Sequence, residues 1–288
     1  MKKHGMTILI ILMFIVGLSV LLYPAISEYI NEKHASRIIA DYHTVLDNTG
    51  EDELNEMLRK AQDYNRRLAE NPAAFFNPAS VSGYSETLDL IGIGVMGKIS
   101  IPKIGVELPI YHTVEPEVLQ IGAGHLEGTS LPVGGRDTHC VLSGHRGLPS
   151  AKLFTALDRL SVGDTFTINV LNEVLTYEID QILTVKPDQT DALQIVKGMD
   201  YCTLLTCTPY GINTHRLLVR GVRIGTQTEK AGIFVSNEAF KIDPLIVTPI
   251  VALPMLLALL LITTLGSKTK SRRKKTAEKE ENRKNEKT

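Results

Sequence analysis

Two long apolar stretches constrain this chain more than any other feature of its sequence. The first runs from Thr7 to about Ile26 without a charged residue, and Lys2 and Lys3 precede it. An uncharged run of roughly twenty residues is long enough, as a helix, to cross about 30 Å of hydrocarbon. A cleaved signal peptide is the alternative, although its apolar core is normally only about 7 to 15 residues long. We predict an N-terminal transmembrane anchor over residues 1–28.

The second stretch covers residues 244–266 and is followed by a run of lysines and arginines. Because positive residues stay on the cytoplasmic side of a membrane, both termini are expected in the cytoplasm and the middle of the chain outside the cell. Pro249 and Pro254 would be costly in a soluble helix but are tolerated in a membrane span. A buried core helix is the alternative. We predict a second transmembrane helix, a charged cytoplasmic tail over residues 267–288, and hence a multi-pass protein of the cell membrane.

The chain between the two stretches is long enough for one sizeable extracellular domain. The whole sequence has 288 residues, 43% of them hydrophobic, with 31 basic and 32 acidic side chains. This near balance of charge gives no indication of nucleic-acid binding. Apolar residues recur at helical spacing on both sides of Gly50, which predicts two amphipathic helices within residues 29–94, packed on the domain. A β-rich domain is predicted over residues 95–228, with a linker over residues 229–243.

The β-rich segment contains runs that are typical of strands. Short apolar or Thr-containing runs at 165–170, 174–185, 202–207 and 217–224 are bounded by turn residues, and each predicts a strand. Shorter helical patterns predict helices at 150–160 and 188–197.

A cysteine and an arginine flank one predicted turn. Cys207 ends a strand-like run, Arg216 opens the next, and Pro209, Gly211 and Asn213 lie between them. A thiol with the ordinary pKa of about 8.5 is only a few per cent thiolate at neutral pH, so a nearby cation would activate it as a nucleophile. Alternatively, the guanidinium donates hydrogen bonds to an oxyanion or to a substrate backbone. A buried structural cysteine beside a surface arginine remains the simplest reading of these residues alone.

A histidine lies in a second segment of similar character. An apolar run leads into His145, which has Gly144 before it and Gly147 shortly after it. Glycines on both sides allow a sharp turn that leaves the imidazole exposed at a strand end, where it can act as a general acid or base. His125 also lies between glycines, and we interpret it as structural.

Together these segments resemble the sortase family, specifically the pilus-building class C. The resemblance rests on Leu-Ser-Gly-His-Arg-Gly at 142–147, Thr-Cys-Thr-Pro-Tyr-Gly at 206–211 and the His-Arg-Leu-Leu-Val that follows, and it covers roughly residues 95–225. It implies a closed sortase-type barrel of about eight strands. Together with the N-terminal helices and the two transmembrane helices predicted above, the expected fold class is mainly β. The resemblance also implies that Cys207, His145 and Arg216 are the catalytic residues of a cysteine transpeptidase.

The class C resemblance further implies a lid over the active site. In that class the lid carries Asp-Pro followed by an aromatic residue, whereas this chain has Asn77-Pro78-Ala79, with Phe75 and Phe76 as the nearest aromatic residues. A lid without the anionic group and a plain linker both remain open for this breaker-rich segment.

Three cysteines leave at least one thiol free. Cys202 and Cys207 are five residues apart on one predicted strand, about 16 Å, which is beyond the roughly 7 Å that a disulfide can bridge. Cys140 and Cys202 either pair or remain two buried thiols. No spacing of His and Cys resembles a zinc site and no glycine-rich phosphate loop is present, so neither a metal nor another cofactor is expected.

The resemblance implies that Cys207 cleaves the Thr-Gly bond of a Leu-Pro-any-Thr-Gly-like sorting signal and forms a thioacyl enzyme. The expected partners are pilin or surface proteins with a C-terminal sorting signal, together with the membrane. Joining the acyl fragment to a pilin lysine would assemble a pilus. Two alternatives remain, a sortase that anchors surface proteins to the cell wall and a non-enzymatic, membrane-tethered barrel that binds surface proteins.

Overall fold

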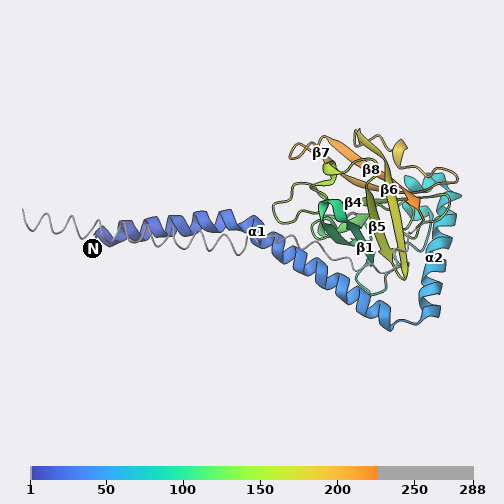
Figure 1. Cartoon of the computed structure of the whole chain (residues 1–288), viewed down its shortest axis with the longest axis horizontal. Helices are drawn as coiled ribbons and strands as arrows, with labels where there is room; N and C mark the ends of the chain where they lie inside the picture. The colour runs from blue at the N-terminus through green and yellow to red at the C-terminus, as the bar shows by residue number, and fades with distance from the viewer. Residues whose placement is uncertain (1, 226–288) are drawn as a thin grey trace, which may run out of the picture. The chain divides into compact units, whose positions relative to one another are not determined.

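The computed structural model describes residues 2–225 and contains eight strands in one closed barrel (Figure 1). The strands follow one another around the barrel in the order β1-β2-β3-β4-β7-β8-β6-β5. Their bounds are β1 Val95–Ile101, β2 Val106–Tyr111, β3 Ala123–His125, β4 Thr138–Ser143, β5 Thr165–Val170, β6 Glu173–Val185, β7 Asp200–Thr208 and β8 His215–Ile224. The predicted mainly β fold with a barrel of about eight strands is therefore confirmed.

Two neighbouring pairs of strands are parallel, β2 with β3 and β4 with β7, and all the others are antiparallel. In the β4–β7 pair, Cys140 lies opposite Cys202 and Ser143 lies opposite Leu205. The carboxyl ends of these two strands therefore meet at the same end of the barrel.

The interior of the barrel is filled by aromatic and branched side chains. Phe166 on β5 and Tyr177 on β6 are fully buried and stack with ring centroids 5.5 Å apart. The Tyr177 hydroxyl donates a hydrogen bond to Asp200 Oδ1 at 3.0 Å, which satisfies a polar group that would be costly to bury alone.

Two long helices precede the barrel in the sequence, and a short one lies between β2 and β3. Helix α1 spans Lys2–Asn48, α2 spans Glu51–Ala69, and a short α3 spans Pro116–Leu119. The two predicted amphipathic helices are present, with the break at Gly50, but α1 is continuous through residue 28, so it has no boundary where the anchor was expected to end. Figure 1 shows α2 beside the barrel.

Buried hydrogen bonds tie the helices to the barrel. The Tyr42 hydroxyl donates to Met96 O at 3.2 Å and accepts from Leu171 N at 2.8 Å. Asn65 on α2 bonds both the N–H and the C=O of Leu131, at 2.7 and 3.1 Å. These contacts orient the amphipathic helices on the domain.

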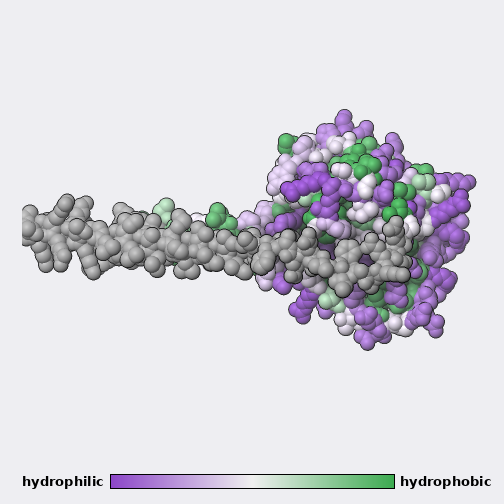
Figure 2. All heavy atoms as spheres, in the orientation of Figure 1, coloured by the Kyte–Doolittle hydropathy of each residue, from purple (hydrophilic) through white to green (hydrophobic). Residues whose placement is uncertain are grey.

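One helix in residues 2–225 is long and apolar enough to cross a membrane, and it is part of α1. Its apolar side chains are exposed, among them Leu12, Met13 and Leu21. The second predicted span at 244–266, the linker at 229–243 and the tail at 267–288 lie outside the described residues. Residues up to Ile26 belong to a different unit from the one that starts at Ser27 and holds the barrel. Figure 2 shows a mainly hydrophilic surface on the barrel-containing unit.

The predictions of two short helices, at 150–160 and 188–197, are wrong. Residues 150–160 form turns and a 3-10 helix at Leu157–Arg159, and residues 188–197 contain only a 3-10 helix at Asp191–Leu193. Phe154 is fully buried against the main core, and a Cβ added to Gly144 would lie 2.6 Å from its ring. Packing of this ring, rather than helical periodicity, sets the local backbone.

Candidate active site

Cys207 and Arg216 are direct partners across two neighbouring strands. Cys207 is the penultimate residue of β7, Arg216 is the second residue of β8, and the register of the antiparallel pair puts them opposite each other. Arg216 Nη1 donates hydrogen bonds to Asn213 O at 3.2 Å and His215 O at 3.1 Å, so the guanidinium also ties the turn between the strands. Both side chains are partly exposed.

His145 lies next to this pair because β4 runs parallel to β7. Beyond the Ser143–Leu205 pair, Gly144 N donates to Leu205 O at 3.0 Å, and Thr206 Oγ1 donates to Gly144 O at 2.6 Å. These bonds continue the alignment of the two strands, so the next residues along, His145 and Cys207, are neighbours. The structure thus brings the three predicted site residues to one end of the barrel, although they come from three different strand ends.

The loop that carries His145 is held by hydrogen bonds to the segment after it. Phe154 N donates to His145 O at 3.1 Å, and Gly147 N donates to Thr155 Oγ1 at 3.0 Å. Gly147 has a left-handed backbone (φ +81°), and an added Cβ would lie 2.9 Å from the ring of Tyr210. This glycine therefore lets the loop after β4 approach the β7–β8 turn closely.

Partial burial lowers the pKa of His145 below its ordinary value of about 6.5. Burial disfavours the charged imidazolium, because a partly buried ring is less well solvated by water than an exposed one. At neutral pH the ring is therefore mainly uncharged and able to accept a proton.

An apolar surface lies directly beside the three residues. Side chains alternate along a strand, so Leu205 shares a face with Cys207, and Leu218 shares a face with Arg216. Here the outer apolar patch means the buried residues Val141, Leu193 and Leu218 together with the partly buried residues that pack against them, which are Phe75, Leu126, Leu183, Val185, Ala192 and Leu205. Its partly buried members leave some apolar surface accessible next to the thiol.

The possible lid segment reaches this patch through Phe75, one of the two aromatic residues nearest to Asn77-Pro78 in the sequence. Phe75 is half-buried and packs against the patch, whereas Asn77 is exposed and Pro78 is half-buried. Two 3-10 helices, Pro72–Phe75 and Pro78–Ser80, give the segment its shape. The contact comes from the aromatic ring that precedes the Asn-Pro pair.

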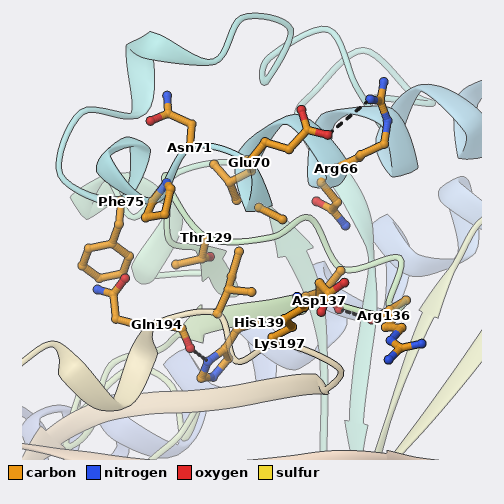
Figure 3. Close-up of a pocket in the computed structure, with 18 of the residues that line it drawn as sticks. Arg66, Glu70, Asn71, Phe75, Thr129, Arg136, Asp137, His139, Gln194 and Lys197 are labelled. Atoms are coloured by element: carbon orange, nitrogen blue, oxygen red, sulfur yellow. Dashed lines mark hydrogen bonds and ion pairs between the residues drawn. The ribbon is translucent and has the colours of Figure 1, made fainter.

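A well-formed pocket lies elsewhere on the domain (Figure 3). It has a volume of about 720 Å³ and lies between the end of α2, residues 71–75, and the connections that precede β4 and β7. His139 lies in its wall, and its Nδ1 donates to Gln194 O at 2.9 Å. Arg66 and Glu70 form an ion pair at 3.6 Å on its rim. None of Cys207, His145 and Arg216 lines this pocket.

The remaining predictions can be placed in the structure. Cys140 and Cys202 lie opposite each other on β4 and β7 as buried free thiols, and the Cys207 thiol is free and partly exposed. His125 is fully buried, with Nε2 donating to Ser130 O at 2.8 Å, as expected of a structural histidine. Within residues 2–225 no group of three or more His, Cys, Asp or Glu is arranged to hold a metal ion.

The sequence alone assigned no role to Arg146. Arg146 is the residue directly after His145, and its Nη1 donates to Thr208 Oγ1 at 3.0 Å. The Gly-His-Arg-Gly run made this arginine visible in the sequence, but no local pattern showed which segment it would meet.

Comparison with known proteins connects this geometry to one family. A family model for the sortase domain matches residues 99–224. Curated relatives named sortase A or sortase D are 28–30% identical, and the chain spans 55–63% of their length. For sortase A of Streptococcus agalactiae the identity is 30% over 143 residues, which is 49% of this chain and 55% of that protein.

Solved structures match over most of their own length. Sortase C1 from Streptococcus agalactiae is 48% identical, with a TM-score of 0.60 over 66% of this chain and 98% of that one. Sortase C from Streptococcus pneumoniae is 45% identical, with a TM-score of 0.61 over 66% and 97%. Sortase C from Clostridium perfringens, solved with a C-terminal cell wall sorting motif, is 42% identical, with a TM-score of 0.58 over 66% and 100%. A barrel of this topology, an identity above 40% and nearly complete coverage of class C structures show that this chain belongs to the sortase family.

Proposed function

We propose that this protein is a membrane-anchored cysteine transpeptidase that acts on proteins with a C-terminal sorting signal. The observation that carries the proposal is the meeting of Cys207, Arg216 and the His145 loop at one end of the barrel, beside the outer apolar patch. A nucleophile, a titratable base and a permanent cation within one small region are the groups that acyl transfer requires.

In the proposed reaction the neutral imidazole of His145 accepts the proton of the Cys207 thiol. The thiolate attacks the Thr carbonyl carbon of a Leu-Pro-any-Thr-Gly-like signal, and Arg216 stabilises the oxyanion or orients the substrate backbone. The Thr-Gly C–N bond then breaks, the departing glycine amine takes the proton from His145, and a thioester joins the acyl fragment to Cys207. An incoming amine attacks the thioester, gives its proton to His145 and releases the thiolate.

A pilin lysine is the proposed incoming amine. Support comes from the class C relatives: the pneumococcal structure concerns pilin substrate specificity, and the Clostridium perfringens structure contains a sorting motif. Pilus assembly therefore ranks ahead of wall anchoring, in which a cell wall peptide would supply the amine. No step of the proposed reaction uses a cofactor.

We also propose that α1 anchors the enzyme and that the barrel is extracellular. The exposed apolar side chains of α1 support the anchor, and the two basic flanks in the sequence support cytoplasmic termini. The same arrangement would keep the active site near the membrane in which its substrates are held.

The test is intact-mass spectrometry of the full chain in detergent, mixed with a sorting peptide. The expected result is a thioacyl adduct on Cys207, no adduct and no cleavage with Cys207→Ala, and a loss of about 100-fold in kcat/KM with Arg216→Lys. The lysine in Arg216→Lys keeps the positive charge, but its ammonium group lacks the planar set of donors, so the charge alone should not restore kcat/KM. Turnover by the Cys207→Ala protein would refute the assignment, and peptide binding without any covalent adduct would favour the non-enzymatic barrel.

A further inference from the structure

We propose that Arg146 is a positioning residue that holds the His145 loop against the segment that carries Cys207. The inference rests on the function proposed above and adds a residue to its site. Arg146 follows His145 directly, and Thr208 follows Cys207 directly. The bond of 3.0 Å from Arg146 Nη1 to Thr208 Oγ1 therefore joins the two segments one residue away from the reacting side chains.

The same guanidinium is fixed by a second partner. Arg146 Nη2 donates to Asp158 Oδ2 at 2.5 Å, and only 9% of the arginine side chain is exposed. Asp158 belongs to the 3-10 helix Leu157–Arg159, whose Leu157 is fully buried in the main core. One planar group thus connects the His145 loop, the end of β7 and a segment anchored in the core.

A second hydrogen bond joins the two segments on the other side of His145 and Cys207. Thr206, directly before Cys207, donates from Oγ1 to the carbonyl of Gly144, directly before His145, at 2.6 Å. One hydrogen bond therefore joins the residues directly before His145 and Cys207, and another joins the residues directly after them. The Thr206 bond extends the alignment of β4 and β7, whereas the Arg146 bond lies beyond the last paired residues and depends on side chains alone.

Geometry explains why an arginine is required at this position. The donors of a guanidinium lie in one plane, so Thr208 and Asp158 can be bonded at the same time by a rigid group. A lysine offers a single ammonium on a flexible chain and cannot fix both partners in one arrangement. Without the arginine, the His145 loop retains its backbone bonds to the following segment but loses its side-chain link to the end of β7.

The proposal is tested by steady-state kinetics on the full chain in detergent, with a fluorogenic peptide that contains Leu-Pro-any-Thr-Gly. Arg146→Ala is expected to lower kcat about 10- to 100-fold with KM changed by less than about threefold, because a displacement of about 1 Å can cost 100-fold. Arg146→Lys should recover little of this loss. Thr208→Val should lower kcat less, and its effect should nearly vanish in the Arg146→Ala background, because both changes remove the same bond.

The matched control is Arg159→Ala, which removes an exposed arginine from the same 3-10 helix and should leave kcat unchanged. Thiol titration and circular dichroism give the folded fraction, so that kcat is expressed per folded enzyme. The inference would be overturned if folded Arg146→Ala enzyme had the same kcat as the wild type. It would also be overturned if the effects of the Arg146 and Thr208 changes were additive. Cleavage by Cys207→Ala would instead overturn the proposed function, and this inference with it.

Discussion

The three cysteines of the domain differ in their exposure to solvent. Cys140 and Cys202 are 2% and 0% exposed and face the core, whereas Cys207 is partly exposed at the end of β7. A buried thiol is protected from reagents as long as the barrel stays closed, and a nucleophile must be accessible to its substrate. Exposure therefore separates the candidate nucleophile from two thiols of the same chain.

This difference predicts the alkylation pattern of the folded protein. Iodoacetamide should add one group to the native chain and three to the chain unfolded in denaturant, because only Cys207 is exposed in the fold. Intact-mass spectrometry counts the adducts, and Cys207→Ala should take up none under native conditions. Two or more adducts on the native wild-type chain would contradict the burial of the β4 and β7 thiols.

At the scale of elements, the segment between α2 and β1 is the candidate lid of the proposed site. Phe75 packs on the outer apolar patch, and Asn77, where a class C lid has an acid, is exposed. Ala74 and Val81 anchor the segment in the main core, whereas its contact with the patch comes from one half-buried ring and includes no anionic group. Burial of part of a phenylalanine stabilises closure by about 1 kcal/mol, so the segment should open readily.

Alkylation rates of Cys207 measure this closure. Phe75→Ala, and deletion of residues 73–82, should each raise the rate less than about tenfold, because a factor of ten corresponds to about 1.4 kcal/mol. Phe76→Ala is the matched control, since that ring is 75% exposed and its loss should leave the rate unchanged. A rise well above tenfold would show a tight lid, and equal effects of the two phenylalanine changes would show that the Phe75 contact is not what covers the thiol.

At the scale of the whole molecule, one buried histidine links stability to pH. Burial lowers the pKa of His139 to about 4, although a hydrogen bond to the Gln194 carbonyl opposes this shift. Its Nδ1 donates to that carbonyl and its Nε2 accepts from Thr203 Oγ1 at 2.7 Å, so the neutral ring is fully bonded. The unfolded chain, with a histidine pKa of about 6.5, binds a proton more readily than the folded chain.

Stability should therefore fall as the pH is lowered from about 6.5 to about 4, with a contribution from His139 of about 3 kcal/mol. Above pH 6.5 this contribution is constant, because the histidine is then neutral in both states. Urea unfolding followed by circular dichroism measures the free energy, since the chain has no tryptophan. His139→Gln should lower stability at pH 7 but flatten its decline toward acid, and an unchanged slope would contradict the assignment.

The topology of the whole chain gives a further prediction. If both termini are cytoplasmic, protease added to intact cells should remove the barrel and leave the lysine-rich tail protected, because the membrane excludes the protease. An epitope placed after residue 288 reports the tail by immunoblot, and permeabilised cells serve as the control. Digestion of the tail in sealed cells would refute the proposed two-span arrangement.

The sequence by itself determined the features that depend on neighbouring residues. The long apolar run of α1, the break at Gly50, the strands on both sides of the Cys207–Arg216 turn and the glycines around His145 are all local patterns, and the structure contains each of them. Local periodicity failed between 150 and 160, where burial of Phe154 determined the backbone.

Only the tertiary structure decided which distant segments meet. His145 and Cys207 become neighbours because β4 and β7 pair in parallel, and this register depends on the closure of all eight strands. The bond from Arg146 to Thr208 and the packing of Phe75 on the outer apolar patch likewise join residues far apart in the chain. The distance between two residues across a barrel cannot be read from their separation in the sequence, because strand pairing and side-chain packing together set that distance.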